Sequence, residues 1–310
     1  MRGTRAKRRA SSTVSGAVLG AACGLFGLAA AGTVEIAAQE VGPANGALVV
    51  VGGAMRSPEI VDRFVQLAGG PGARIVVIPT AGGQESYDQS FGGLRPFQLA
   101  GVRNLTLRHT NDRDEADSEA FAAAIREASG VWFSGGRQWR LVDSYMGTRT
   151  EEELWALLER GGVIGGSSAG ATIQGSYLAR GDTATNTIMM GSHEEGLGFL
   201  RNTAIDQHLL YRNRQFDLLE IIEARPELLG IGIDENTAIV VQNDRFEVIG
   251  ESYVAIYDHQ SILDSGDPFF LLAPGDQFDL AEREAYRPAR TLQPLRRVEA
   301  RPSPRGRPER

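Results

Sequence analysis

A serine stands at the centre of a glycine-rich stretch near the middle of the chain. Residues 166–170 read Gly-Ser-Ser-Ala-Gly, with Ser168 at the third position, and a short apolar run over 163–164 precedes them. The pattern G-x-S-x-G is typical of a sharp strand-to-helix turn that exposes a nucleophilic hydroxyl, and the N–H of Ala169 would then help to hold an oxyanion. The same stretch also suits a phosphate-binding turn or plain tight packing. A serine hydrolase is therefore a hypothesis that other residues must support.

A serine nucleophile needs a base that takes its proton and an acid that orients this base. Among the four histidines, His208 fits the base, because it follows an apolar run and so stands at the carboxyl end of an expected strand. Glu235 fits the acid for the same reason. Asp234 and Asp206 are rivals for the acid, and spacing alone does not choose among the three carboxylates.

Two further features suit a substrate. The Gly135-Gly136 turn can supply a second backbone N–H for the oxyanion, because glycine lets its backbone approach a ligand closely. Arg212 and Arg214 lie at the start of an expected helix, and one of them would grip a substrate carboxylate through paired N–H donors. The plainer interpretations are an ordinary loop and a solvated helix end.

The first half of the chain alternates strand and helix patterns. Such alternation predicts an α/β fold with a mostly parallel sheet covered by helices on both faces. Ligands of such sheets gather beyond the carboxyl ends of the strands, so we expect the candidate residues to meet at one rim of the sheet. The expected strands are 47–51, 74–79, 102–107, 131–133 and 163–164, and the expected helices are 58–68, part of 85–100, 114–128 and 151–159.

Beyond residue 177 the pattern changes. A polar loop over 181–198 leads to an expected strand at 203–207 and a helix over 212–223. An apolar run over 229–234 and three short strand patterns follow, and we expect the latter to form a meander that extends the sheet. These short strands are 238–241, 246–249 and 254–257, with one more at 269–272.

Composition excludes several classes of protein. The chain has 310 residues and a net charge of −7, and this acidic balance argues against a nucleic-acid partner. Cys23 is the single cysteine. It lies inside the N-terminal segment described next, so the mature protein would have no disulfide, no thiolate nucleophile and no cysteine-based zinc site.

The N-terminus reads as a targeting segment. Residues 1–9 carry five Lys or Arg and no acid, and residues 14–31 are uncharged and apolar. This pattern predicts a secretory signal peptide over 1–38, cut near 31 or 38, and hence an exported protein without stable membrane association. A retained membrane anchor is the alternative. We expect the catalytic domain at 46–275 and a disordered tail, rich in Arg and Pro, at 290–310.

Taken together, four motifs resemble those of the cyanophycinases and the wider S51 family of serine exopeptidases, which includes aspartyl dipeptidases. The motifs are Ser-Gly-Gly-Arg-Gln at 134–138, Gly-Gly-Ser-Ser-Ala-Gly-Ala at 165–171, Asp-Gln-His at 206–208 with Arg212 and Arg214, and Gly-Ile-Gly-Ile-Asp-Glu-Asn-Thr-Ala at 230–238. The resemblance implies a three-layer, flavodoxin-like sandwich similar to class I glutamine amidotransferases, with serine in place of the cysteine nucleophile.

The resemblance also implies roles for individual residues. It makes Ser168 the nucleophile, His208 the base and Glu235 the orienting acid, with Gly136 and Ala169 in the oxyanion hole. The substrate pocket would be lined by Gln138, Asp206, Gln207, Arg212 and Arg214.

The expected function is that of an exported serine exopeptidase for β-aspartyl bonds. Cyanophycinases release β-aspartyl-arginine dipeptides from a poly-aspartate backbone that bears arginines, so the substrate would be a small peptide or such a polymer. An α-aspartyl dipeptidase and a non-catalytic exported binding protein are the alternatives. The family implies no metal, no organic cofactor and a homodimer. Two residues depart from its pattern, Ser167 where Thr is common and Arg137, which would repel an arginine side chain if it faced the pocket.

Overall fold

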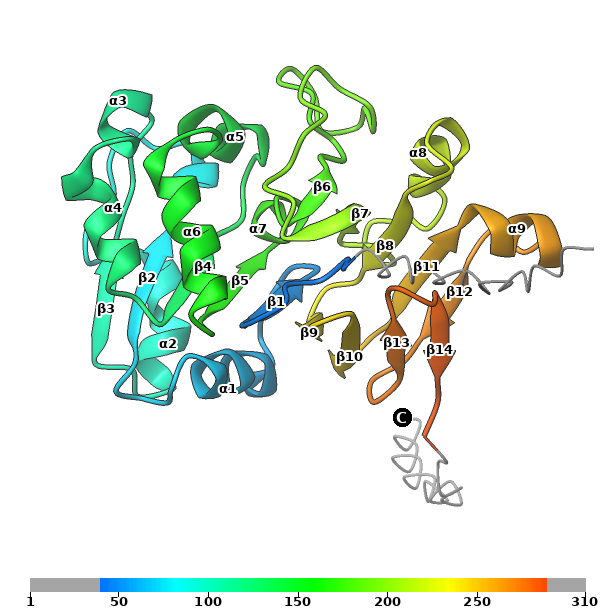
Figure 1. Cartoon of the computed structure of the whole chain (residues 1–310), viewed down its shortest axis with the longest axis horizontal. Helices are drawn as coiled ribbons and strands as arrows, with labels where there is room; N and C mark the ends of the chain where they lie inside the picture. The colour runs from blue at the N-terminus through cyan, green and yellow to red at the C-terminus, as the bar shows by residue number, and fades with distance from the viewer. Residues whose placement is uncertain (1–39, 289–310) are drawn as a thin grey trace, which may run out of the picture. The chain divides into compact units, whose positions relative to one another are not determined.

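The computed structural model describes residues 40–288 (Figure 1). The predicted signal peptide over 1–38 and the predicted tail over 290–310 lie outside these residues. None of the helices within residues 40–288 combines the length and the apolar character needed to cross a membrane.

Nine strands of this part of the chain form one sheet, here called sheet A, in the order β14-β13-β10-β9-β1-β5-β4-β2-β3. Its five neighbouring parallel strands are β1 (Ala47–Val51), β5 (Val163–Ser167), β4 (Gly130–Phe133), β2 (Arg74–Ile78) and β3 (Asn104–Leu107). Its antiparallel strands are β9 (Thr237–Gln242), β10 (Arg245–Gly250), β13 (Gln277–Asp279) and β14 (Glu284–Tyr286).

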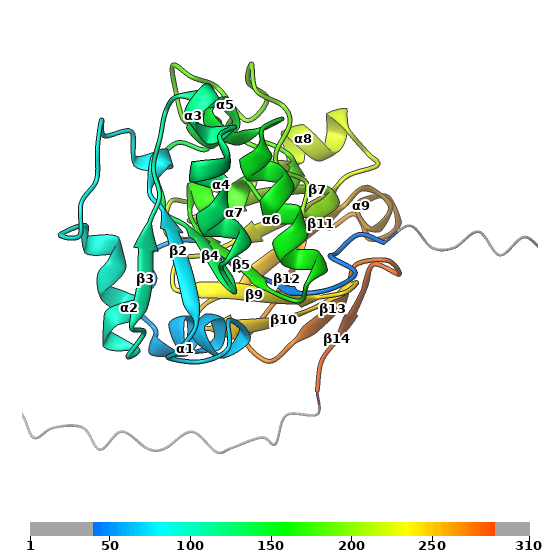
Figure 2. The ribbon, with the colours of Figure 1, turned by 60° about the vertical axis from the view of Figure 1, so that its left-hand side comes forward.

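The strand β1 is buried at every residue because both faces of sheet A are covered. Leu48 and Val50 pack into one hydrophobic cluster with α4 and α6, whereas Val49 and Val51 pack into another with α1 and α2 (Figure 2). The helices here are α1 (Pro58–Leu67), α2 (Arg95–Leu99), α3 (Arg113–Ala116), α4 (Glu119–Arg126), α5 (Trp139–Tyr145), α6 (Arg149–Glu159) and α7 (Ala169–Thr172), with 3-10 turns η1 (Thr80–Gly82) and η2 (Gly92–Leu94). The predicted α/β architecture is confirmed.

Some helix bounds differ from those predicted. The helix expected over 114–128 is broken in two, because the hydroxyl of Ser118 caps α4 by accepting the N–H of Phe121 at 3.2 Å. Only 95–99 is α-helical within 85–100. The helix expected from 212 begins at Leu218, and α5 was not expected at all.

Five more strands form a second sheet, sheet B, in the order β12-β11-β8-β7-β6. They are β12 (Phe270–Leu272), β11 (Val254–Asp258), β8 (Leu229–Ile233), β7 (Leu200–Gln207) and β6 (Gly175–Tyr177), and α8 (Leu218–Ala224) and α9 (His259–Ser265) accompany them. The expected meander is therefore correct for β9 and β10, which extend sheet A, but wrong for β11, which pairs with β8 in sheet B. All five residues of β11 are buried, so its pattern carries no sign of which sheet it joins.

Candidate active site

Ser168 stands in a strained turn between β5 and α7. Its φ of 58° and ψ of −113° place it in a backbone conformation that residues other than glycine rarely adopt. Its N–H donates to the carbonyl of Val51 at 3.0 Å, which ties the turn to the end of β1. The predicted strand-to-helix turn is confirmed, and a backbone held in this way presents the hydroxyl beyond the end of the sheet.

The two glycines around Ser168 allow the chain to pack closely. A Cβ at Gly166 would lie 2.2 Å from the carbonyl oxygen of Gly170, and a Cβ at Gly170 would lie 2.2 Å from that of Phe133. Neither distance is compatible with a side chain. The G-x-S-x-G pattern is thus required by the contact of α7 with β5 and β4.

His208 connects Ser168 to Glu235. Its Nε2 lies 2.9 Å from Oγ of Ser168, and its Nδ1 lies 2.7 Å from Oε1 of Glu235. The side chains of His208 and Glu235 are only 9% and 12% exposed. A hydroxyl, an imidazole and a carboxylate in this order form the arrangement that general-base activation of a serine requires.

Strand pairing explains why the histidine and the acid meet. The strands β7 and β8 run parallel with Gln207 opposite Ile233, so the residues after them emerge side by side. Ser168, however, follows a strand of sheet A. The expectation that the three side chains share one rim of one sheet is therefore wrong, because the site forms where the carboxyl ends of strands from two sheets come together.

The two rival acids have other partners. One carboxylate oxygen of Asp234 accepts the N–H groups of Leu210 (3.0 Å) and Tyr211 (2.9 Å), and the other accepts the hydroxyl of Ser252 at 2.7 Å. Asp234 therefore fixes the turn that follows His208.

Asp206 is fully buried. Its two oxygens accept Nε and Nη2 of Arg180 at 2.8 and 3.0 Å, and Arg180 also pairs with Asp217. Asp206 accordingly has no exposed surface to offer a substrate, contrary to expectation. Arg180 was missed, because nothing in the sequence distinguishes it from a solvated arginine.

The environment of His208 favours the neutral imidazole. Burial lowers its pKa, and the positive charge of Arg212 acts in the same direction. The hydrogen bond to Glu235 raises the pKa, but the net shift is below the ordinary value of 6.5. An imidazole that is neutral at neutral pH can accept a proton from the hydroxyl it faces.

The Gly135-Gly136 turn lies against Ser168. A Cβ at Gly135 would be 3.3 Å from the Cβ of Ser168. A Cβ at Gly136, whose φ is 147°, would lie 2.0 Å from the carbonyl oxygen of Ala81, so only glycine fits there. The hydrogen bonds of residues 40–288 leave the N–H groups of Gly136 and Ala169 unused, as an oxyanion site requires.

Two of the other expected pocket residues, Gln138 and Gln207, are buried and bind neighbouring protein groups. Gln138 is fully buried, and its amide donates to the carbonyls of Ala179 (2.6 Å) and Arg180 (3.0 Å), so it holds the chain that leads into the 181–198 loop. Gln207 accepts Nη1 of Arg214 at 2.9 Å through its side chain.

Two arginines remain accessible near the histidine and the acid. Arg212 is exposed, and its N–H donates to the carbonyl of His208 at 3.0 Å. The guanidinium of Arg56, which the sequence did not single out, lies 3.9 Å from Oε2 of Glu235 and is 75% exposed. The side chain of Arg137 donates to the backbone carbonyl of Asp182 at 3.2 Å.

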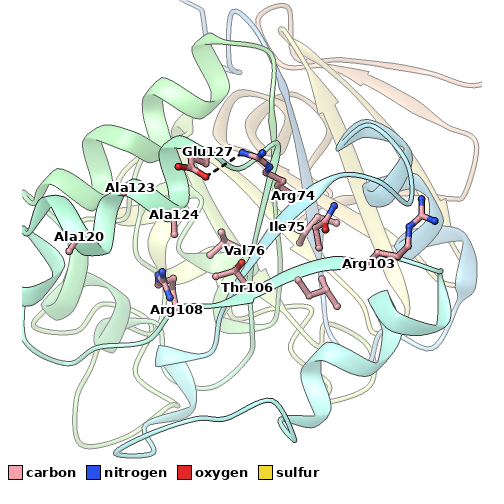
Figure 3. A pocket seen from close by; sticks show the side chains of 12 residues that line it. Arg74, Ile75, Val76, Arg103, Thr106, Arg108, Ala120, Ala123, Ala124 and Glu127 are labelled. Carbon is pink, nitrogen blue, oxygen red and sulfur yellow. Dashed lines mark hydrogen bonds and ion pairs between the residues drawn. The ribbon is translucent and has the colours of Figure 1, made fainter.

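A separate cavity of about 670 Å³ lies between β2, β3 and α4 (Figure 3). Arginines 74, 103 and 108 surround it, with Glu127 paired to Arg74 at 3.3 Å. It shares no residue with the site at Ser168. Within residues 40–288, no group of three or more His, Cys, Asp or Glu side chains is arranged to hold a metal ion.

Comparison with known proteins shows the family of the chain. A family model described as peptidase family S51 matches residues 48–249. The cyanophycinase of Geminocystis herdmanii is 32% identical over 225 residues, which cover 69% of this chain and 81% of that protein. The cyanophycinase of Trichormus variabilis is 30% identical over 263 residues, which cover 76% of this chain and 86% of that protein.

The fold also has a relative among solved structures. The crystal structure of a peptidase from an acI-B1 Actinobacterium matches with a TM-score of 0.58 and 23% identity, and the match covers 77% of this chain and 98% of that one. This likeness concerns the fold, which is of the class I glutamine amidotransferase type. On the family model and the cyanophycinase relatives together, the chain belongs to peptidase family S51.

Proposed function

We propose that the protein is an exported serine exopeptidase that acts on peptides with β-aspartyl linkages, with Ser168, His208 and Glu235 as its catalytic triad. The observation that carries this proposal is the chain of hydrogen bonds from Ser168 through His208 to Glu235, at 2.9 and 2.7 Å. The similarity to cyanophycinases supports the substrate class. We also propose export, on the N-terminal pattern, and a homodimer, on the resemblance to the family.

The first half of the reaction forms an acyl-enzyme. Oγ of Ser168 attacks the carbonyl carbon of the scissile bond while Nε2 of His208 takes the hydroxyl proton, and Glu235 stabilises the imidazolium that results. The N–H groups of Gly136 and Ala169 hold the oxyanion of the tetrahedral intermediate. The C–N bond then breaks, and His208 returns its proton to the leaving amine.

The second half releases the product. Water attacks the ester carbonyl, His208 accepts one of its protons, and the bond between the acyl carbon and Ser168 breaks. The proton passes back to Ser168, so the enzyme returns to its starting state. No step needs a metal ion or an organic cofactor.

The accessible charge near the triad suits an acidic substrate. The exposed Arg212 adjoins His208, and the guanidinium of Arg56 lies beside Glu235. A guanidinium binds a carboxylate through two parallel hydrogen bonds. We assign the recognition of a substrate carboxylate to Arg212, and we assign Asp206 and Gln138 to the support of the site because both are buried.

The test is a hydrolysis assay of the mature chain. Cyanophycin, β-aspartyl-arginine, other β-aspartyl dipeptides and the matching α-aspartyl dipeptides are incubated with the protein and with its Ser168→Ala variant. Release of β-aspartyl-arginine from the polymer by the wild type alone supports the proposal. Turnover of α-aspartyl dipeptides alone would make the protein an α-aspartyl dipeptidase. A protein that cleaves none of them and gives no phosphonate adduct on Ser168 would be a binding protein.

A further inference from the structure

One short segment holds all three turns of the triad. The carbonyl oxygens of residues 51–53 accept, in chain order, the N–H groups of Ser168 (3.0 Å), His208 (2.9 Å) and Asn236 (2.8 Å). Asn236 directly follows Glu235 in the chain. Three consecutive peptide groups at the end of β1 therefore contact the nucleophile turn, the histidine turn and the acid turn.

These contacts join two sheets that share no strand pairing. Ser168 follows a strand of sheet A, whereas His208 follows a strand of sheet B, and no strand of one sheet is hydrogen-bonded to a strand of the other within residues 40–288. The distance between hydroxyl and imidazole therefore depends on contacts outside the strand pairing. The segment 51–53 provides such contacts, because it binds both turns through its backbone.

Glycine is needed at both positions that follow β1. A Cβ at Gly53, whose φ is +144°, would lie 2.3 Å from Cε1 and 2.5 Å from Nδ1 of His208. The imidazole thus rests directly on the bare α-carbon of Gly53. A Cβ at Gly52 would lie 2.3 Å from the carbonyl oxygens of both Ile233 and Asp234, so the acid turn also packs against this segment.

We propose that the Gly52-Gly53 turn is the positioning element of the triad, and that Gly53 sets the place of the imidazole between Ser168 and Glu235. A ring that rests on an α-carbon cannot move toward it, and a side chain at Gly53 displaces the ring from both partners. The catalytic meaning of this role rests on the proposed function, whereas the packing itself does not.

The first experiment compares Gly53→Ala with Gly69→Ala. Gly69 is a matched control, because it also has a positive φ (+106°) but a Cβ there would meet nothing within 4 Å. Both variants carry the strain of alanine at positive φ, and only Gly53→Ala adds the collision with His208. The readouts are the rate at which a serine-reactive phosphonate labels Ser168, the pH dependence of this rate, and KM and kcat on the best substrate.

We expect Gly53→Ala to lower the labelling rate and kcat by about 10²-fold, since a displacement of about 1 Å costs that much. Its KM should change little, and its pH midpoint should move because the imidazole loses the hydrogen bond to Glu235. Gly69→Ala should label at the wild-type rate. Equal labelling rates and pH midpoints for Gly53→Ala and the wild type would overturn the inference.

A second experiment needs no activity. The fall in Tm caused by Gly53→Ala is measured in the wild type and in a His208→Ala background. The fall should be larger in the wild type, because the ring that the new Cβ would strike is absent from the background variant. A Gly53→Ala protein that folds only with His208→Ala gives the same answer. Equal falls in both backgrounds would contradict the packing role, whereas a wild type that is not labelled at Ser168 would contradict the proposed peptidase alone.

Discussion

The imidazole of His208 lies 2.9 Å from the hydroxyl of Ser168, although the two residues are 40 positions apart and follow strands of different sheets. The contact is not a consequence of strand pairing, because the pairing orders only the ends of strands within one sheet. The contact depends on how the two sheets meet. Each of the two residues can be tested by its own substitution.

Removal of the hydroxyl or of the imidazole should abolish turnover. We expect Ser168→Ala to lower kcat by about 10⁶-fold and His208→Ala to be nearly as severe, since triad residues act as a unit. Far-UV circular dichroism should show an intact fold. Ser265→Ala, which changes an exposed serine on α9, is the control and should retain activity. Turnover by Ser168→Ala near the wild-type rate would reject the assignment of the nucleophile.

The two neighbouring acids should separate chemistry from stability. Glu235→Gln should lower kcat by about 10⁴-fold with little change in Tm, because the imidazole loses the partner that orients it and stabilises its charge. Asp234→Asn should mainly lower Tm, since the Asp234 carboxylate accepts two backbone N–H groups and the hydroxyl of Ser252. The measurement is kcat beside thermal unfolding. A larger loss of kcat in Asp234→Asn would transfer the orienting role to Asp234.

The acid limb of the pH profile should follow the pKa of His208. Because burial lowers this pKa, the neutral base persists, and kcat/KM should hold, to a pH below 6.5. Arg212→Gln removes a positive charge that lowers the pKa, so its acid limb should move to higher pH. Glu235→Gln removes a partner that raises the pKa, so its limb should move to lower pH.

The pH prediction has a matched control. Arg103→Gln also removes one positive charge, but Arg103 lies beside β3 at the separate cavity and is not among the groups that shift the pKa of His208. Its profile should match that of the wild type. A shift of Arg212→Gln in the acid direction would show that the charge of Arg212 does not reach the imidazole.

The buried ion pair next to the triad should matter for stability. Asp206→Ala leaves the guanidinium of Arg180, 2% exposed, without its bidentate partner, and breaking such a pair costs about 3–5 kcal/mol. We expect the lower end of this range, because Asp217 remains beside Arg180. Urea unfolding measures the loss.

Glu127→Ala is the control for the ion pair. It breaks the ion pair with Arg74, in which the side chain of Arg74 is 66% exposed and that of Glu127 is 70% exposed. Solvent screening should make the loss of stability small. Equal losses of stability in the Asp206→Ala and Glu127→Ala variants would mean that burial does not set the contribution of the Arg180–Asp206 pair.

Local patterns in the sequence were sufficient to predict individual strands and turns. The apolar run at 47–51 forms β1 with the predicted bounds, and the G-x-S-x-G stretch forms the predicted strand-to-helix turn at Ser168. These features can be predicted from neighbouring residues, because small residues permit a sharp turn and a continuous apolar run indicates a buried strand. The placement of Glu235 after a strand was visible for the same reason.

Position at a strand end did not separate the three acids; the resemblance to the family named Glu235, and the tertiary structure provides its contact with His208. Glu235, Asp234 and Asp206 all stand at strand ends, yet only Glu235 reaches the imidazole, while Asp206 pairs with Arg180. Arg180 lies 26 positions from Asp206 in the chain, and no spacing rule connects the two. The part of Gly53 was hidden in the same way, since its contact with His208 joins distant segments.

The sequence by itself determined which residues follow the strands and which of them can do acyl-transfer chemistry. Only the tertiary structure decided that β11 joins a second sheet, and that Ser168, His208 and Glu235 of the proposed triad meet between the two sheets. The physical reason is that strand ends are specified by short-range hydrophobic patterns, whereas the meeting of two ends depends on packing among residues far apart in the chain.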